Sequence, residues 1–323
     1  MSRKEQVLSF IREKRGEWVS GESLSREFKI SRTAIWKHIR RLREEGYGIE
    51  SSPKKGYLFR TASRMLLPNE IREGLETTVF GKGEIFYFKE IDSTNTRAKD
   101  LAIKGALEGT LIISETQSGG RGRMGRDWFS PAQEGIYVSL ILRPNISPVE
   151  APKITLLTAV AVAEALLSLT RLDISIKWPN DILINRKKIA GILTELSTEL
   201  DLISYVVVGV GLNANTSQFP PDIRGEATSV FLETGEYFSR VRFLREYLKQ
   251  HEKYYDISKK IGFGPVIDRW RELADIIGRR IKVRMLDSQY TGVVEDIDEN
   301  GELIIKGDEG GYQRVFSGDV TLE

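Results

Sequence analysis

The 323-residue sequence predicts an α+β protein built from several domains, and three observations carry this prediction. The chain is too long for one ordinary domain. Helical periodicity dominates its start, strands and helices mix in its middle, and strand patterns alone follow Gly278. Its composition, 40% hydrophobic and 29% charged, excludes disordered, collagen-like and membrane classes. We predict domains at residues 1–62, 63–277 and 278–323, with a linker around Pro68.

Residues 1–62 have the element order of a winged helix-turn-helix. Two short helices are expected over residues 4–15 and 22–28, a third begins at the N-cap Ser31, and two extended runs meet at a basic turn. This head carries 15 Lys and Arg against 8 Asp and Glu, whereas the rest carries 33 against 38. Only the head is therefore expected to bind a polyanion, operator DNA.

The third helix is expected to enter the major groove while the turn, or wing, contacts phosphates. Trp36 could pack inside the head or lie against the DNA backbone, and we expect packing. The candidate DNA-binding residues are Ser31, Arg32, Thr33, Trp36, Lys37, Arg40, Lys54 and Lys55.

The middle of the chain alternates short strands and helices. Because strands often follow one another without an intervening helix, a mixed or antiparallel sheet is expected. The apolar run 156–169 is interrupted by Glu164 and is shorter than the ~18 residues of a membrane span, so we expect a buried helix. The tail reads as a small β-barrel. Strands are expected over residues 85–88, 110–115, 136–142, 174–178, 182–184, 189–196 and 205–212, and helices over 96–103, 153–169, 240–255 and 265–276.

The chain has no cysteine and two histidines, His38 and His251. This excludes disulfides, thiolate metal sites and a cysteine nucleophile, and it disfavours a histidine metal site or a Ser-His-Asp triad. We therefore expect no protein-held metal. The N-terminus shows no secretory signal, so the cytoplasm is the expected compartment.

Residues 117–128 hold the sequence's most informative motif, a glycine loop with three arginines. The spacing G-x-G-x-x-G occurs here, but dinucleotide binding needs a helix to begin among the glycines, and Trp128 to Pro131 follow instead. A flexible loop whose amides and guanidinium groups surround a phosphate is favoured over an inert basic loop or an RNA-binding tract. The three arginines are Arg121, Arg123 and Arg126.

Two further clusters accompany the loop. Lys177 ends a strand, Pro179 breaks it, and a hairpin should return Lys188 near Asn180 and Asp181. The run 92–95 (Asp-Ser-Thr-Asn) lies between a strand and a helix, where such residues most often serve as an N-cap. Beside the arginine loop, these clusters supply cations for a phosphate and one carboxylate.

These motifs together resemble the family of bifunctional biotin–protein ligases and biotin operon repressors. The resemblance rests on the glycine-arginine loop, Lys-Trp-Pro-Asn-Asp, Lys-x-Ala-Gly-Ile and the winged-helix segment that begins at Ser31, and it covers the whole chain. It implies a class II synthetase-like mixed α/β catalytic domain and an SH3-like C-terminal domain. It also implies two steps: biotin and Mg-ATP give biotinyl-5′-AMP, and a carrier-protein lysine then attacks it. Met124 occupies a position that some relatives fill with arginine.

The resemblance also implies a role for each matching residue. Lys188, Arg121, Arg123 and Asp181 would be catalytic. Biotin would be bound by Ser93, Thr94, Asn95, Gln117, Arg121, Gly122, Arg123, Lys188 and Gly191. ATP and the adenylate would be bound by Arg123, Trp128, Lys177, Asn180, Asp181 and Asn213.

The implied partners are biotin carboxyl carrier protein, operator DNA and, with the adenylate bound as corepressor, a second copy of the chain. Mg²⁺ is expected to arrive with ATP. Two other readings stay open: a metabolite-sensing repressor without catalysis, and a lipoate-type ligase. The arginines and Lys188 disfavour a mere sensor, which needs no phosphate cations, and the winged helix with the arginine loop favours biotin over lipoate.

Overall fold

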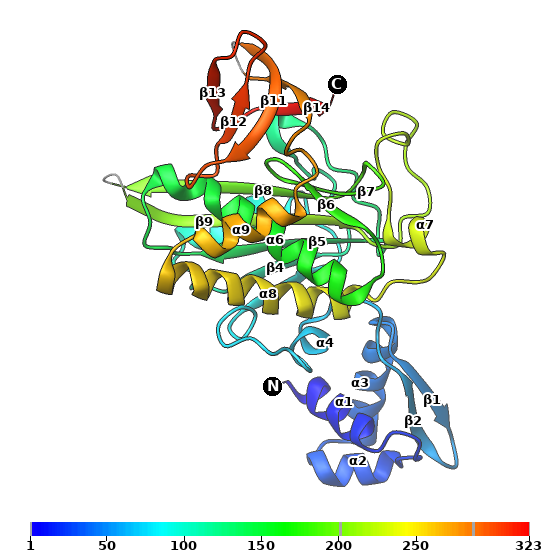
Figure 1. Cartoon of the computed structure of the whole chain (residues 1–323). Coiled ribbons are helices and arrows are strands. Elements are labelled where there is room, and N and C mark those ends of the chain that lie inside the picture. The colour runs from blue at the N-terminus through cyan, green and yellow to red at the C-terminus, as the bar shows by residue number, and fades with distance from the viewer. Residues whose placement is uncertain (1, 200–201, 286–287, 323) are drawn as a thin grey trace. The chain divides into compact units, whose positions relative to one another are not determined.

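A computed structural model describes residues 2–199, 202–285 and 288–322 of the chain (Figure 1). The chain forms two compact units, Met1–Glu73 and Gly74–Glu323. The expected three-domain division at residues 62 and 277 stays a prediction.

The first unit has the predicted winged helix-turn-helix order. The hydroxyls of Ser2, Ser20 and Ser31 accept backbone N–H bonds at the starts of its three main helices, so serine caps set where these helices begin. The strands pair antiparallel around the basic turn. The elements are α1 (Arg3–Glu13), α2 (Gly21–Phe28), α3 (Arg32–Glu44), β1 (Gly48–Ser52), β2 (Gly56–Thr61) and α4 (Pro68–Arg72).

Trp36 does not pack inside the head, so this expectation was wrong. Its side chain is 50% exposed, and the Arg40 guanidinium carbon lies 5.3 Å from the ring centroid. Ile35, Ile39 and Leu42 fill the buried face of α3, and a residue directly after Ile35 is rotated by about 100° from it. The helix therefore turns Trp36 away from the core.

The expected linker around Pro68 contains the short helix α4, which belongs to the head. Glu70 is 4% exposed, accepts a hydrogen bond from the Tyr47 hydroxyl at 2.8 Å and pairs with Arg12. A buried carboxylate needs such partners, because burial without them is costly. These contacts tie α4 to the first unit.

The second unit is centred on a seven-stranded mixed sheet of order β3-β4-β5-β9-β8-β7-β6. The β3–β4 pair is parallel and the other neighbours are antiparallel, which confirms the expected mixed sheet. The strands are β3 (Ile85–Phe88), β4 (Leu111–Ser114), β5 (Gly135–Leu142), β6 (Ile174–Lys177), β7 (Asp181–Ile184), β8 (Lys187–Glu199) and β9 (Leu202–Asn213).

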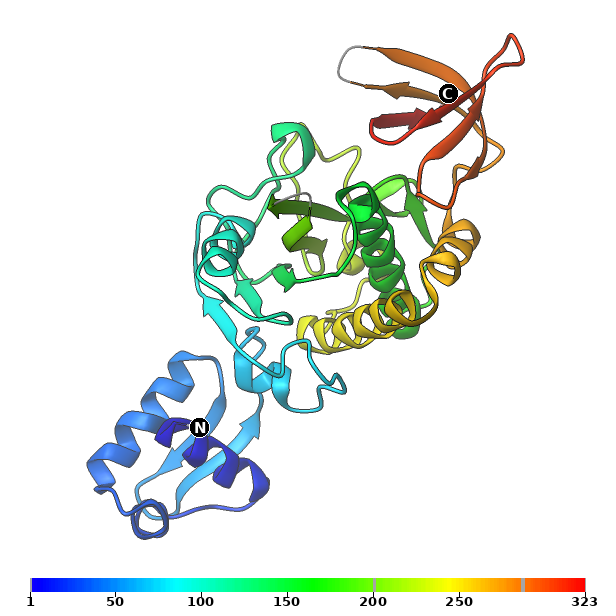
Figure 2. The same cartoon turned by 90° about the vertical axis from the view of Figure 1, so that its left-hand side faces the viewer.

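Helices cover both faces of this sheet (Figure 2). On β8, Thr194 contacts Thr155 of α6, while its neighbour Glu195 contacts Asn95 of α5, as the two-residue alternation of a strand requires. Helices α8 and α9 pack beside α6. The helices are α5 (Thr94–Ile103), α6 (Ala151–Leu169), α7 (Val230–Thr234), α8 (Arg240–Ile261) and α9 (Gly264–Leu273).

Helix α6 is the expected buried apolar helix. With the turn before it, residues Pro148–Leu169 are long and apolar enough to cross a membrane, but 67% of the most apolar window is buried within the fold. This burial is typical of a core helix.

Several elements differ from the sequence prediction at their ends. Helix α8 continues beyond residue 255 to Ile261, where Gly262 with φ +85° stops it. The β8–β9 hairpin is longer than its hydrophobic pattern, because backbone pairing continues through polar residues. Helix α7 was not predicted; its five residues are too few for a periodic signal.

The C-terminal segment is purely β, as predicted. Its five strands form an antiparallel sheet of order β13-β12-β11-β10-β14. The strands are β10 (Arg280–Arg284), β11 (Gln289–Ile297), β12 (Leu303–Lys306), β13 (Tyr312–Val315) and β14 (Asp319–Leu322).

Candidate active site

A cavity of about 690 Å³ lies in the second unit, between the seven-stranded sheet, the glycine loop and the start of β14. Every residue that the sequence assigned to catalysis or to biotin and ATP binding lines it. These residues are Ser93, Thr94, Asn95, Gln117, Arg121, Gly122, Arg123, Trp128, Lys177, Asn180, Asp181, Lys188, Gly191 and Asn213.

One end of the cavity is lined by neutral hydrogen-bonding groups. The Gln117 amide oxygen accepts from the backbone N–H of Thr94 at 2.8 Å and lies 3.1 Å from the Thr94 hydroxyl. The Ser139 hydroxyl lies 2.6 Å from the amide oxygen of Asn95 and 2.8 Å from the Thr94 hydroxyl. Ser93 caps α5. This end suits a small polar group with both donors and acceptors, such as a cyclic urea.

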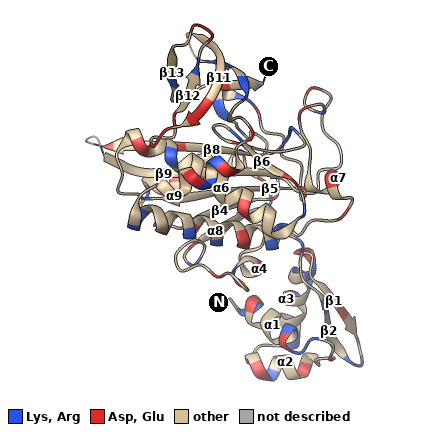
Figure 3. Cartoon of the chain, viewed as in Figure 1, with Lys and Arg blue, Asp and Glu red and all other residues tan. Residues whose placement is uncertain are grey.

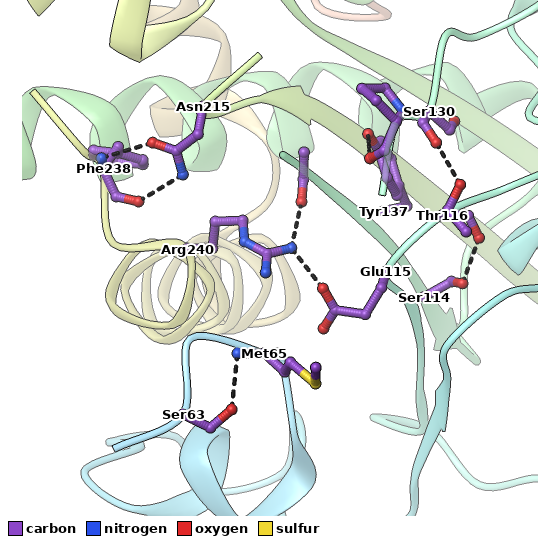
Figure 4. Close-up of polar contacts among 12 residues, drawn as sticks. Ser63, Met65, Ser114, Glu115, Thr116, Ser130, Tyr137, Asn215, Phe238 and Arg240 are labelled. Atoms are coloured by element: carbon purple, nitrogen blue, oxygen red, sulfur yellow. Dashed lines mark hydrogen bonds and ion pairs between the residues drawn. The ribbon is translucent and has the colours of Figure 1, made fainter. Parts of the chain in front are cut away.

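Contacts from other elements hold residues 115 and 116, which connect the end of β4 to Gln117 (Figure 4). The Thr116 hydroxyl donates to the carbonyl of Ser130 at 2.7 Å, and the Gln117 amide donates to the Ser130 hydroxyl at 3.1 Å. Nearby, the buried Arg240 guanidinium donates to Glu115 at 2.8 Å and to the Gly135 carbonyl at 3.0 Å. These contacts join the segment after β4 to β5 and α8, next to Gln117 in the chain.

A cation and a carboxylate face each other at the centre of the cavity. The ammonium of Lys188 lies 2.7 Å from Asp181 Oδ1 and 5.3 Å from the centroid of the Trp128 ring. The β7–β8 hairpin brings the two charges together, as the sequence predicted, because Leu183 pairs with Lys188 across it. Lys188 is 35% exposed and thus accessible to a ligand.

Three glycines let side chains lie directly on the sheet. Gly191 and Gly211 pair across β8 and β9, and an added Cβ would come within 2.8 Å and 2.4 Å of the Trp128 ring. A Cβ on Gly209 would lie 2.2 Å from the amide oxygen of Asn95. Sequence reasoning found Gly191 but missed Gly209 and Gly211; two glycines at alternate positions of a strand were the available signal.

The glycine loop forms a tight turn rather than a helix start. Arg123–Gly125 make one 3₁₀ turn, Met124 has φ +56°, and Arg126 is extended, so the dinucleotide reading fails on backbone grounds. The Arg123 guanidinium donates to the Asn180 side chain at 3.1 Å. Burial lowers the pKa of Arg123, although Asp181 and Asp319 oppose this shift. Arg121 reaches back to the Thr96 hydroxyl at 2.6 Å.

The C-terminal sheet completes the cavity, which the sequence did not reveal. Arg123 donates to the Ser317 hydroxyl at 3.1 Å and lies 3.4 Å from the carbonyl of Gly318. Arg126 pairs with Asp319. Burial would raise the pKa of Asp319, but the hydrogen bond from Arg126 outweighs it and the net shift is downward. No local motif identifies Ser317 and Asp319 as partners of the glycine loop, because they lie far from it in the sequence.

The remaining candidate residues occupy the rim and floor. Lys177 ends β6, before the cis Trp178–Pro179 bond. Asn180 donates to the Ile192 carbonyl at 3.0 Å, and Asn213 donates to the Thr228 carbonyl at 3.1 Å. The Asn180 amide oxygen accepts from Arg123, so this side chain links the β7–β8 region to the glycine loop.

Within residues 2–199, 202–285 and 288–322, no group of three or more His, Asp or Glu side chains is placed to hold a metal ion.

The first unit carries basic residues on several elements, and those assigned to DNA lie on α3 and in the wing turn (Figure 3). Arg32, Trp36 and Arg40 follow one another at four-residue spacing, so they share a stripe on the exposed side of α3. Lys54 and Lys55 are exposed in the wing turn, and Lys55 lies 5.8 Å from the Trp18 ring centroid. Ser31 caps α3, and Thr33 and Lys37 are exposed on it.

Comparisons with known proteins match all three parts of the chain. Residues 87–213 match the biotin/lipoate A/B protein ligase family, residues 3–58 an HTH domain, and residues 276–322 the biotin protein ligase C-terminal domain. The bifunctional ligase/repressor BirA of Bacillus subtilis (strain 168) is 39% identical over 308 residues, covering 95% of this chain and 94% of that protein. BirA of Escherichia coli (strain K12) is 30% identical over 307 residues, with the same coverage.

A solved structure of biotin protein ligase from Aquifex aeolicus in complex with biotin and ATP is similar to 74% of this chain. It has a TM-score of 0.65 and 30% identity, and 98% of that protein is covered.

The fold and the cavity define a class of protein: a ligase with a mixed α/β catalytic core and its own winged-helix DNA-binding unit. Within this class the alignments extend over nearly the whole chain and include both the head and the C-terminal sheet. The chain belongs to the family of bifunctional biotin–protein ligases and repressors.

Proposed function

We propose that this chain condenses biotin with ATP to form biotinyl-5′-AMP, transfers the biotin to a lysine of biotin carboxyl carrier protein, and represses biotin genes with the adenylate as corepressor. The observation that carries this proposal is the single cavity that gathers neutral urea-binding groups, phosphate-binding cations and one carboxylate. We also propose a cytoplasmic location, which the absence of cysteine in the sequence supports.

In the first half-reaction, the biotin carboxylate attacks the α-phosphorus of Mg-ATP and pyrophosphate leaves. The polar end around Thr94 and Gln117 holds the ureido ring. Lys188, Arg121 and Arg123 surround the carboxylate and phosphate, whose negative charge is concentrated in the transition state. Trp128 packs against the adenylate, with Lys177, Asn180 and Asn213 around it.

In the second half-reaction, the amine of the carrier lysine attacks the biotinyl carbonyl and AMP leaves. The amine must be neutral to attack, so it needs a nearby acceptor for its proton. Asp181 fills this role at the centre of the cavity, where it can also orient the incoming amine. Its partner Lys188 then remains beside the departing phosphate.

The test is chemical. The protein is incubated with biotin and Mg-ATP, and the bound ligand is extracted under denaturing conditions and weighed. A biotinyl-AMP mass is the expected result. Recovery of unchanged biotin would instead support a sensor without catalysis, and turnover of lipoate in preference to biotin would support the lipoate-type reading.

Replacing Gly211 by Ala is expected to raise the KM for ATP by about tenfold, the scale of a modest overpacking penalty. The new methyl group displaces the Trp128 ring, from which it would lie 2.4 Å. Pyrophosphate release measured against ATP and biotin separately checks this. Gly264→Ala is the matched control, because an added Cβ there meets nothing within 4 Å. An unchanged KM for ATP in Gly211→Ala would remove Trp128 from the nucleotide site.

Replacing Arg123 by Gly should leave adenylate formation measurable but release the intermediate. The Arg123 contacts to Asn180 and Ser317 hold the glycine loop over the cavity. Without them the anhydride is exposed to water and to foreign amines. We expect biotin labelling of bystander proteins to rise by at least about tenfold. Retention of the intermediate for as long as in the unchanged protein would show that the loop is not a lid.

The DNA-binding function is assigned to α3 and the wing, with operator DNA as the partner. One head offers few contacts, and two heads double them across a two-fold site. We therefore propose that the adenylate orders the glycine loop, that the ordered loop builds a homodimer surface, and that dimerisation switches repression on. Met124, at the loop tip, is 58% exposed and supports such a surface.

Replacing Lys54 and Lys55 together by Ala should weaken binding to operator and random DNA alike. Each lysine is exposed and neutralises one phosphate, so the slope of log K against log salt should fall by about 2 per head. Arg32→Ala, which changes an exposed residue near the start of α3, should instead lower the preference for the operator over random DNA. Titrations at several salt concentrations distinguish the two, and an unchanged slope in the lysine variant would exclude the wing from the interface.

A further inference from the structure

Glu195 lies behind the polar end of the cavity and is held in a defined position. One carboxylate oxygen accepts from the Asn95 side-chain amide at 2.8 Å, and the other pairs with Lys99 at 2.8 Å. Burial would raise the pKa of Glu195, but the hydrogen bonds from Lys99 and Asn95 outweigh it and lower the pKa. The carboxylate is therefore ionised at neutral pH and is an acceptor only.

This acceptor determines which way the Asn95 amide points. The amide nitrogen donates one hydrogen to Glu195 and the other to the backbone carbonyl of Leu193 at 3.1 Å. A flipped amide would place its oxygen against two other oxygens, one of them charged. The Asn95 oxygen must then face Ser139, 2.6 Å away.

The direction of the next hydrogen bonds follows. An amide oxygen cannot donate, so the single Ser139 proton goes to Asn95, and the Ser139 oxygen turns a lone pair toward Thr94. The Thr94 hydroxyl has two partners, Ser139 at 2.8 Å and the Gln117 amide oxygen at 3.1 Å, and both are acceptors. Whichever of these two atoms accepts, the Thr94 hydroxyl donates its proton to a protein atom and not to a ligand.

We infer that Glu195 is a positioning residue that acts through Asn95 to draw the Ser139 proton away from Thr94, which keeps the lone pairs of the Thr94 hydroxyl oxygen free as a hydrogen-bond acceptor for a ureido N–H of biotin. This rests on the proposed function. A cyclic urea offers one carbonyl oxygen and two N–H donors, so its site must present acceptors in a set place. A carboxylate at the end of a chain of hydroxyl and amide groups sets that polarity before the ligand arrives.

The test compares KM for biotin and KM for ATP in pyrophosphate release by the full chain. Glu195→Leu should raise the KM for biotin about tenfold, the scale for losing a charge-assisted hydrogen bond, with the KM for ATP within about twofold. Glu195→Gln keeps an acceptor for Asn95 and should recover most of the affinity. Lys99→Met is the matched control; it breaks the partly exposed ion pair without touching Asn95 and should change KM by less than about twofold.

A double variant separates a relay from simple structural damage. Ser139→Ala interrupts the chain, so adding Glu195→Leu to it should change the KM for biotin by less than about twofold further. Effects that multiply would overturn the inference, as would an unchanged KM for biotin in Glu195→Leu or equal rises for biotin and ATP. Absence of biotinyl-AMP from the unchanged protein would overturn the proposed function instead. If Glu195→Leu unfolds, Glu195→Ala, which also removes the acceptor for Asn95, takes its place in both comparisons.

Discussion

Lys188→Met is expected to slow formation of biotinyl-AMP by about a hundredfold or more, the scale for losing one preorganised electrostatic contact in a transition state. The change keeps the length of the side chain and removes its charge. The backbone of Lys188 bonds to Glu226 and Thr228, and the substitution leaves these bonds in place. Loss of activity would therefore result from loss of the positive charge and not from a disturbed β7–β8 hairpin. Pyrophosphate release with biotin and Mg-ATP measures the effect.

Lys187→Met is the matched control for this variant. Lys187 is the neighbouring residue of β8 and is exposed, and alternate side chains of a strand point to opposite faces. The Lys187→Met variant loses the same charge but should form biotinyl-AMP at a near-normal rate. Near-normal pyrophosphate release by Lys188→Met would remove Lys188 from the first half-reaction, whatever its control shows.

A chain that begins at Gly74 should lose operator binding by at least about a thousandfold, the usual gap between specific and non-specific binding, while biotinyl-AMP formation stays within about threefold. The first unit carries α3 and the wing, whereas every residue assigned to the cavity lies in the second. The structure also determines the residue at which the shortened chain should begin. A start near residue 64 would leave α4 behind, with Glu70 deprived of Arg12 and Tyr47.

The comparison needs a check that the shortened chain is folded, for which thermal unfolding followed by circular dichroism is sufficient. Tight operator binding by the shortened chain would contradict the assignment of the head. Complete loss of adenylation in a folded product would show that the head takes part in ligation. The Aquifex aeolicus ligase, 98% of which is covered by 74% of this chain, is a precedent for a shorter protein with this fold.

Local signals in the sequence were enough for most of the helices and strands, though not for the short helices α4 and α7, and for most of the candidate site. Hydrophobic periodicity and serine caps located the head helices, because both act within a few residues. The glycine-arginine loop, Lys188 and Asp181 were identified because each lies in a short motif. These residues line one cavity. The β7–β8 hairpin brings Lys188 back toward Asp181, and the glycine loop follows a strand; a sequence pattern can predict both features.

Other features depended on contacts between distant segments. Trp36 was misplaced because bulk and hydrophobicity suggested packing, while the angular position on α3 is set by which face the rest of the head covers. The missed glycines of β9 matter only because Trp128 and Asn95 lie on them. Asp319 pairs with Arg126 across more than half of the chain, and strand order rather than any motif brings them together.

The sequence by itself determined the basic head and the order of most helices and strands, and it predicted which groups bind phosphate and biotin, since these depend on composition, periodicity and short-range spacing. The tertiary structure alone decided how those groups are oriented. Glu195 reaches Asn95, and Ser317 reaches Arg123, only after the sheet has fixed its strand order and register. Hydrogen bonds require atoms within about 3 Å and a set direction, and only a folded chain imposes both on residues far apart in sequence.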